Sequence, residues 1–153
     1  MSVKVTGITS TKAELKRTVE RTSDAERKLV RTYSDKIKVL AGKFAPVDEG
    51  FLENAIDTEE NKTVGQRGRL SFQVGVNTDK LGPNFTQRGF PYHIQMHEDP
   101  ENNAGNGPQS REKAARLGVN VGSKYMTRAL DFYRDEIETK ARELAKRQGR
   151  DTL

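Results

Sequence analysis

The chain has 153 residues, of which 33% are hydrophobic and 32% are charged, and its formal net charge is +5. This length predicts one domain, and the low hydrophobic content predicts a thin core. Because the sequence contains no cysteine, disulfide bonds, thiolate catalysis and thiolate metal sites are excluded. No segment is apolar enough to cross a membrane or to serve as a signal peptide, so we expect a chain that is made in the cytoplasm.

The first 45 residues are predicted to form a short arm and one long helix. Residues 1–10 make an N-terminal strand or arm, because apolar and polar residues alternate in Val3-Lys4-Val5. Residues 11–45 hold an amphipathic helix of about thirty residues, which is about 45 Å long at about 1.5 Å per residue. Its apolar residues are spaced by three, by four or by sums of these, at Leu15, Val19, Leu29, Tyr33, Ile37, Leu40 and Phe44.

Residues 46–98 are predicted to hold a structural corner and most of a sheet. At the corner, Pro46 ends the long helix, since proline has no backbone donor. Asp48 then caps a short helix on which Leu52 faces the core. Gly50 allows the backbone to come close to a neighbouring segment. We assign no catalytic role to these four residues.

Alternating hydrophobicity predicts the strands of this region. Residues 56–60 begin a strand, and residues 61–68 have the composition of a hairpin tip. In residues 69–77 every even position is apolar and every odd one is small or polar, which is the strict period of a strand. Residues 92–98 repeat this alternation, with tyrosine, isoleucine and methionine on one face, and are predicted to form another strand.

Two long loops, at residues 77–91 and 99–122, separate these elements. Glycine, proline and asparagine deny them regular structure, except that the middle of the second loop can form an induced helix at 109–117. Four apolar residues in the loops are expected to contact neighbouring subunits or partners, and these are Leu81, Phe85, Phe90 and Leu117. Residues 123–147 then form a C-terminal helix, whose apolar stripe includes Phe132, and residues 148–153 form a tail.

Together these elements predict a single α+β domain over residues 1–153. It contains about four strands, two long α-helices and two long interaction loops. The positive net charge alone does not predict a nucleic-acid site, because basic and acidic residues are interleaved along both helices instead of being segregated.

The residues that carry chemistry do not form a recognisable catalytic or metal motif. His93 and His97 have the spacing of an H-x-x-x-H metal motif, which works on a helix. On the strand predicted here they would lie roughly 13 Å apart, at about 3.3 Å per residue, too far for one metal ion. No nucleophile elbow or phosphate-binding glycine spacing is present. We therefore predict no catalytic, cofactor-binding or metal-ligating residues, and a protein that is not an enzyme.

Three segments, in this order, resemble the tail-completion or head-to-tail joining proteins of tailed bacteriophages. The first is the corner, Ala45-Pro46-Val47-Asp48-Glu49-Gly50-Phe51-Leu52. The second is Tyr92-His93-Ile94-Gln95-Met96-His97-Glu98, which is similar to a strand of that family before a glycine-rich loop. The third is Lys124-Tyr125-Met126-Thr127-Arg128-Ala129-Leu130, which is similar to the opening of the family's final helix. The resemblance extends over residues 11 to 145.

This resemblance implies that the strands form a small antiparallel β-sheet of about four strands, packed on one face by the two long α-helices. It also implies a structural virion protein in the neck, at the interface between head and tail. Copies of the chain would form a ring, with a head connector, adaptor or stopper on one side and a tail terminator on the other. DNA would pass through the lumen without specific binding. The alternative is a cytosolic nucleic-acid-binding or regulatory domain that uses its basic amphipathic helices, and tight DNA retention at physiological salt would favour it.

Overall fold

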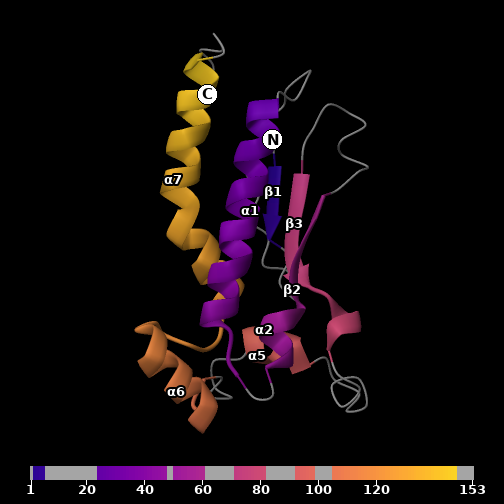
Figure 1. The fold of residues 1–153 in the computed structure, drawn as a ribbon, viewed down its shortest axis with the longest axis vertical. Helices are drawn as coiled ribbons and strands as arrows, with labels where there is room; N and C mark the ends of the chain where they lie inside the picture. Colours follow the sequence, from indigo (N-terminus) through magenta and orange to yellow (C-terminus); the bar gives the residue numbers. More distant parts are fainter. Residues whose placement is uncertain are drawn as a thin grey trace.

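A computed structural model of the chain shows a mixed fold of helices and a small sheet (Figure 1). The sheet contains β1 (Ser2–Val5), β2 (Ile56–Glu60) and β3 (Ser71–Val76) in the order β1-β3-β2. β2 and β3 are antiparallel, whereas β1 is parallel to β3. The structure describes residues 2–5, 24–47, 50–60, 71–81, 92–98 and 105–147.

Two long helices lie side by side next to this sheet (Figure 1). α1 spans Asp24–Phe44 and α7 spans Tyr125–Arg147, within the ranges predicted for helices. They run antiparallel, because Phe44 at the end of α1 contacts Arg128 near the start of α7. Residues 11–23 of the predicted first helix lie outside the described residues, as do the tail and the rest of the N-terminal arm.

The core lies between α1, α7 and the sheet. From α1 it takes residues at helical spacing, and from β3 it takes alternate residues, because a helix and a strand each bury one face. Phe72 and Val74 of β3 are buried as the alternation predicted. The main cluster of buried residues is Val30, Tyr33, Ile37, Ala41, Ala45, Leu52, Ala55, Ile56, Phe72, Val74, Leu81, Tyr125, Met126, Ala129, Leu130 and Ile137.

The strand predicted at residues 92–98 is wrong, since this segment forms helix α5 (Tyr92–Glu98). The prediction counted both histidines as solvent-facing, which left an alternating apolar pattern. In the structure His97 is fully buried and Met96 packs against the core, while His93 is half-buried. Positions 93, 96 and 97 therefore have the spacing of one helix face. Without a strand at 92–98, the described sheet has three strands and is mixed, whereas about four antiparallel strands were expected.

Part of the loop predicted at residues 99–122 is helix α6 (Pro108–Leu117). Pro108 occupies the first turn, where its missing N–H costs nothing. Gly118 ends the helix in the left-handed conformation, at φ 65°, and its N–H donates to Ala114 O at 2.9 Å. In Figure 1, α6 lies beyond the end of the α1/α7 pair, close to where α1 meets the corner.

The other predicted loop, at 77–91, begins with a 3-10 turn over Thr78–Lys80. Asn77 caps this turn, because its side-chain oxygen accepts from Asp79 N at 3.0 Å. The turn delivers Leu81 into the core, where it is 7% exposed. Residues 82–91 lie outside the described part of the chain.

Candidate interaction surface

The predicted corner is present, and its turn depends on the backbone conformation of Gly50. Pro46 is buried directly after α1, and Leu52 is buried in the short helix α2 (Phe51–Ala55). Gly50 has φ 79°, in the left-handed region. A Cβ built there would meet no described heavy atom within 4 Å, so no described segment comes close enough to require glycine at this position. The corner needs glycine because of its φ angle.

Asp48, expected to cap the short helix, lies outside the described residues. The N-cap position of α2 is Gly50, and no side chain in the described part of the chain makes a hydrogen bond there.

Two buried polar side chains of α6 hold it against this corner. Lys113 is 4% exposed, and its Nζ donates to Gly42 O at 2.6 Å and to Ala45 O at 3.0 Å. It also pairs with Glu53 Oε2 at 2.8 Å. A cation on the last carbonyls of α1 satisfies acceptors that the helix itself cannot pair, and it opposes the negative end of the helix dipole.

Ser110, one turn before Lys113, adds a second attachment. Its Oγ donates to Val47 O at 3.0 Å and accepts from Val47 N at 2.9 Å. The two buried residues of α6 are therefore both polar, and α6 is docked by hydrogen bonds to the corner. No sequence pattern distinguishes Lys113 from a lysine in solvent, so this contact was not predicted.

The base of the α6 segment is also tied to α1. Gly122 N donates to Phe44 O at 2.9 Å, and the Arg128 guanidinium lies 4.8 Å from the Phe44 ring centroid. A Cβ at Gly105, which has φ 102°, would lie 2.2 Å from Val121 O. The two ends of the segment 105–122 therefore meet, and glycine is required where they do.

Only one of the four apolar loop residues expected at interfaces is described on the surface. Leu117, at the end of α6, is 38% exposed, and its interface role stays a prediction. Leu81 is buried in the core of its own chain, which leaves it no surface for a partner. Phe85 and Phe90 lie outside the described residues.

The helical form of α5 removes the distance argument against a metal at the two histidines, because residues 93 and 97 lie one turn apart. Even so, no group of three His, Cys, Asp or Glu side chains that could hold a metal ion occurs in the described ranges.

The His97 ring packs edge-on against Tyr125 with centroids 4.9 Å apart, and its Nδ1 lies 2.9 Å from Glu98 Oε1. Burial lowers the pKa of His97, and the Glu98 carboxylate opposes this shift.

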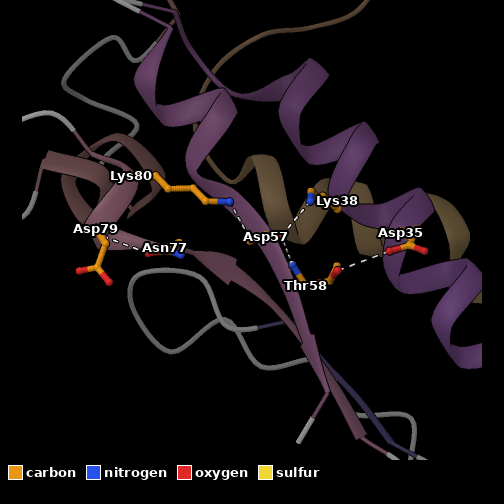
Figure 2. A network of polar contacts seen from close by, with 7 residues as sticks. All are labelled: Asp35, Lys38, Asp57, Thr58, Asn77, Asp79 and Lys80. Carbon is orange, nitrogen blue, oxygen red and sulfur yellow. Dashed lines mark hydrogen bonds and ion pairs between the residues drawn. The ribbon is translucent and has the colours of Figure 1, made fainter.

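A second polar cluster joins α1, β2 and the 3-10 turn (Figure 2). Asp57 accepts from Lys38 Nζ at 2.8 Å and from Lys80 Nζ at 2.6 Å, while Thr58 N donates to it at 2.9 Å. Hydrogen bonds from these two lysines hold the pKa of Asp57 far below its usual range. A carboxylate that is fully ionised and already paired is a poor proton acceptor, so this cluster joins structural elements.

Beside this cluster lies a polar hollow of about 550 Å³, lined by Asp57, Thr58, Glu59, Gln73, Gly75, Val76, Asn77, Thr78 and Asp79. It lies along β2, β3 and the turn. Its lining includes three acidic side chains and two amides, and one of the acidic side chains, Asp57, is already paired with Lys38 and Lys80.

The groove between α1 and α7 contains two open hollows with largely aliphatic and aromatic floors. Hollow A, of about 400 Å³, is lined by Ala25, Lys28, Leu29, Thr32, Tyr33, Lys140, Glu143, Leu144 and Arg147. Hollow B, of about 420 Å³, is lined by Thr32, Asp35, Lys36, Val39, Leu40, Lys43 and Tyr133. Both hollows have more basic than acidic residues in their linings.

A tyrosine cluster separates the two hollows. The rings of Tyr33 and Tyr133 meet edge-on with centroids 6.1 Å apart, and Lys36 Nζ lies 4.6 Å from the Tyr33 centroid. Tyr33 OH donates to Glu136 Oε1 at 2.7 Å. Burial, followed by this hydrogen bond, raises the pKa of Tyr33 to about 12.

Two large apolar side chains are exposed here, Val39 in the lining of hollow B and Phe132 beside Tyr133. Val39 is 59% exposed and Phe132 is 68% exposed, and the Phe132 ring lies 5.0 Å from the Tyr133 ring. The prediction that Phe132 belongs to the buried stripe of the last helix is wrong, because the stripe turns away from it toward Leu130 and Ile137. Among the surfaces that the structure describes, this one combines exposed aromatic area with open hollows.

Comparisons with known proteins do not place this chain in a family. No family model, no curated protein and no solved structure matches it. Within the described residues, no helix has the length and apolar character needed to cross a membrane.

Proposed function

We propose that this protein is a structural subunit of the neck of a tailed bacteriophage, where copies of it form a ring that joins the head connector to the tail. The observation that carries this proposal is the α1/α7 face, where Phe132 and Val39 are exposed beside two hollows with apolar floors. Exposed apolar area next to a concave surface is typical of sites where proteins associate.

The sequence resemblance supports the proposal through two of its three segments. The corner segment forms the turn from α1 into α2, and the segment 124–130 opens α7. The segment 92–98 forms a helix where the resemblance implies a strand. The first and third segments therefore carry the resemblance, and the region between them differs from the expected pattern.

The charged clusters also suit a building block. Lys113 and Asp57 are each saturated by partners from other elements, so they join those elements instead of facing a substrate. On α7, Arg134 pairs with Asp131 at 2.6 Å, and Arg142 pairs with Glu138 at 3.4 Å. Such mixed charge near a DNA channel limits phosphate binding, because each unpaired cation that contacts a phosphate adds affinity.

Mass spectrometry of purified virions, followed by imaging of the neck, tests the proposal directly. We expect the protein in virions in a fixed ratio to the connector, and its density in the neck between connector and tail terminator. Its absence from virions would refute the proposal. Tight, sequence-dependent retention of DNA in a filter-binding assay at physiological salt would instead favour the nucleic-acid-binding alternative.

A further inference from the structure

We propose that Phe132 of one copy of this chain inserts into hollow B of another copy, and that this is the main contact between subunits. The inference deepens the proposed function, because it names the surfaces through which the copies associate. Since one chain carries both the projecting ring and the hollow, the same contact can repeat from copy to copy.

The projecting side is an aromatic ring with acidic neighbours. Phe132 is 68% exposed, and the flanking Asp131 and Asp135 are exposed as well. Arg134 pairs with Asp131 at 2.6 Å and offsets one of these charges, which leaves the immediate surroundings of the ring net acidic. An aromatic side chain that stays exposed in the monomer gains the most when a partner removes it from water.

The receiving side has the complementary character. Val39, Leu40 and Tyr133 give hollow B an apolar and aromatic floor. Lys36 pairs with Glu136 at 3.6 Å and Asp35 accepts from Thr58 Oγ1 at 3.4 Å, so Lys43 is the charged residue of this lining that has no partner among the described residues. Its volume of about 420 Å³ exceeds the roughly 150 Å³ cavity that holds a benzene molecule in a protein core. A phenyl ring with acidic flanks therefore fits this hollow in size, in polarity and in charge.

The face that contains both features is large enough for a specific interface. α7 has 23 residues and is about 34 Å long, and a pair of packed helices is about 20 Å wide. The face thus covers roughly 700 Å², near the roughly 800 Å² per partner of a standard interface. A second copy of the chain can cover it without help from other surfaces.

Disulfide trapping tests the contact, because the natural chain has no cysteine. Single-cysteine variants Asp131→Cys, which is exposed beside Phe132 and keeps its ring, and Val39→Cys are mixed and oxidised, and the mixed dimer is quantified by mass spectrometry. As a control, Arg116→Cys on α6, which is exposed and outside the face, replaces Asp131→Cys. We expect at least tenfold more mixed dimer from the 131/39 pair than from the 116/39 pair. Equal yields would overturn the proposal.

Charge exchange gives a second, independent test. Lys43→Glu, introduced into the Val39→Cys chain, should lower the cross-linking yield severalfold, because the rim of the hollow then repels the acidic flank of Phe132. Asp135→Lys, introduced into the Asp131→Cys partner chain, should restore the yield. A Lys43→Glu chain that cross-links as well as its parent, or one that Asp135→Lys does not rescue, would contradict the contact.

The outcomes separate this inference from the proposed function. Specific cross-linking by a protein that is absent from virions would support the contact and refute the neck function. A protein that is present in the neck but cross-links without preference would support the function and refute the contact. Closed pairs that never grow into larger rings would support the contact while removing the ring from the proposed function.

Discussion

A single buried lysine connects α6 to the rest of the molecule. The Lys113 ammonium donates hydrogen bonds to the carbonyl oxygens of Gly42 and Ala45, at the end of α1. Without Lys113, these carbonyl oxygens would lose a partner in a buried place. Because leaving buried carbonyls unpaired costs more than an exposed hydrogen bond contributes, this side chain has a larger effect than its residue type suggests.

Lys113→Met should therefore lower the free energy of unfolding by about 2 kcal/mol. The figure is moderate because Glu53, the ionic partner, is 43% exposed and its contribution is screened by solvent. Urea denaturation measures the change. Arg116→Met, an exposed position on the same helix, is the control and should change stability by less than about 0.5 kcal/mol. If both variants unfold alike, Lys113 does not support the corner.

Gly50 is the second residue on which the corner depends. With φ 79°, it occupies a conformation in which a β-branched side chain is strained. Gly50→Val should lower the free energy of unfolding by about 1–2 kcal/mol, and with it the melting temperature and the soluble yield. Gly50→Asn should cost clearly less, since asparagine tolerates this region. Equal melting temperatures for the two variants would show that the φ angle is not the constraint.

At the scale of elements, β3 and α7 each carry one phenylalanine, and the two differ in their exposure to solvent. Phe72 is 6% exposed under α1, whereas Phe132 is 68% exposed. Phe72→Ala should destabilise the fold by about 3–5 kcal/mol, because it leaves a cavity in the core. Phe132→Ala should change the stability of the monomer by less than about 0.5 kcal/mol. A cost below about 1 kcal/mol for Phe72→Ala would place the core on the other face of the sheet.

The Asp57 cluster joins three elements and makes stability depend on pH. Its two lysine hydrogen bonds lower the pKa of Asp57 in the folded state. The stabilisation is therefore complete above the unfolded pKa, about 3.9, and is lost as the pH falls below it toward the folded value. Asp57→Asn should be less stable than the natural chain at pH 6, and the difference should shrink below about pH 4. A difference that does not change between pH 6 and pH 3 would contradict this linkage.

Sequence patterns predicted an element correctly where its buried face is made of apolar residue types. Phe72 and Val74 alternate with polar neighbours, so β3 was predicted with nearly its actual bounds. His97 is buried although its type is polar, because its ring packs on Tyr125 and one nitrogen faces Glu98. With His97 counted as exposed, the apolar residues of 92–98 alternate as they do in a strand, and a strand was therefore predicted. With His97 counted as buried, the buried positions have the spacing of a helix.

The candidate surface was hard to predict for a related reason. Phe132 belongs by type to a buried stripe, and only the direction of α7 against α1 places it in solvent. For Lys113 the error is the opposite one: a lysine is expected to be exposed to solvent, but the contact with the end of α1 buries it. In both cases the position of a neighbouring helix decides the environment, and local periodicity carries no information about that position.

At the scale of the whole molecule, the thin core and the open helix face belong together. The sheet is covered through α1, and α7 packs mainly against α1, so the outer surface of the helix pair has no third layer within the described part of the chain. A domain of this length buries a limited share of its surface, and association with further copies increases that share. Assembly and stability are then coupled, so that the melting temperature should rise with protein concentration once copies associate.

The parallel pairing of β1 with β3 has a consequence for how the chain acquires its fold. Ser2 pairs with Ser71, so the first strand must wait for a segment made roughly 70 residues later. At about 5–20 residues per second on the ribosome, the delay is roughly 4 to 14 seconds. During this interval β1 lacks β3, its partner in the described sheet, whereas β2 and β3 are close in sequence and pair soon after they are made. Of the three described strands, β1 is thus made earliest and is the last to pair.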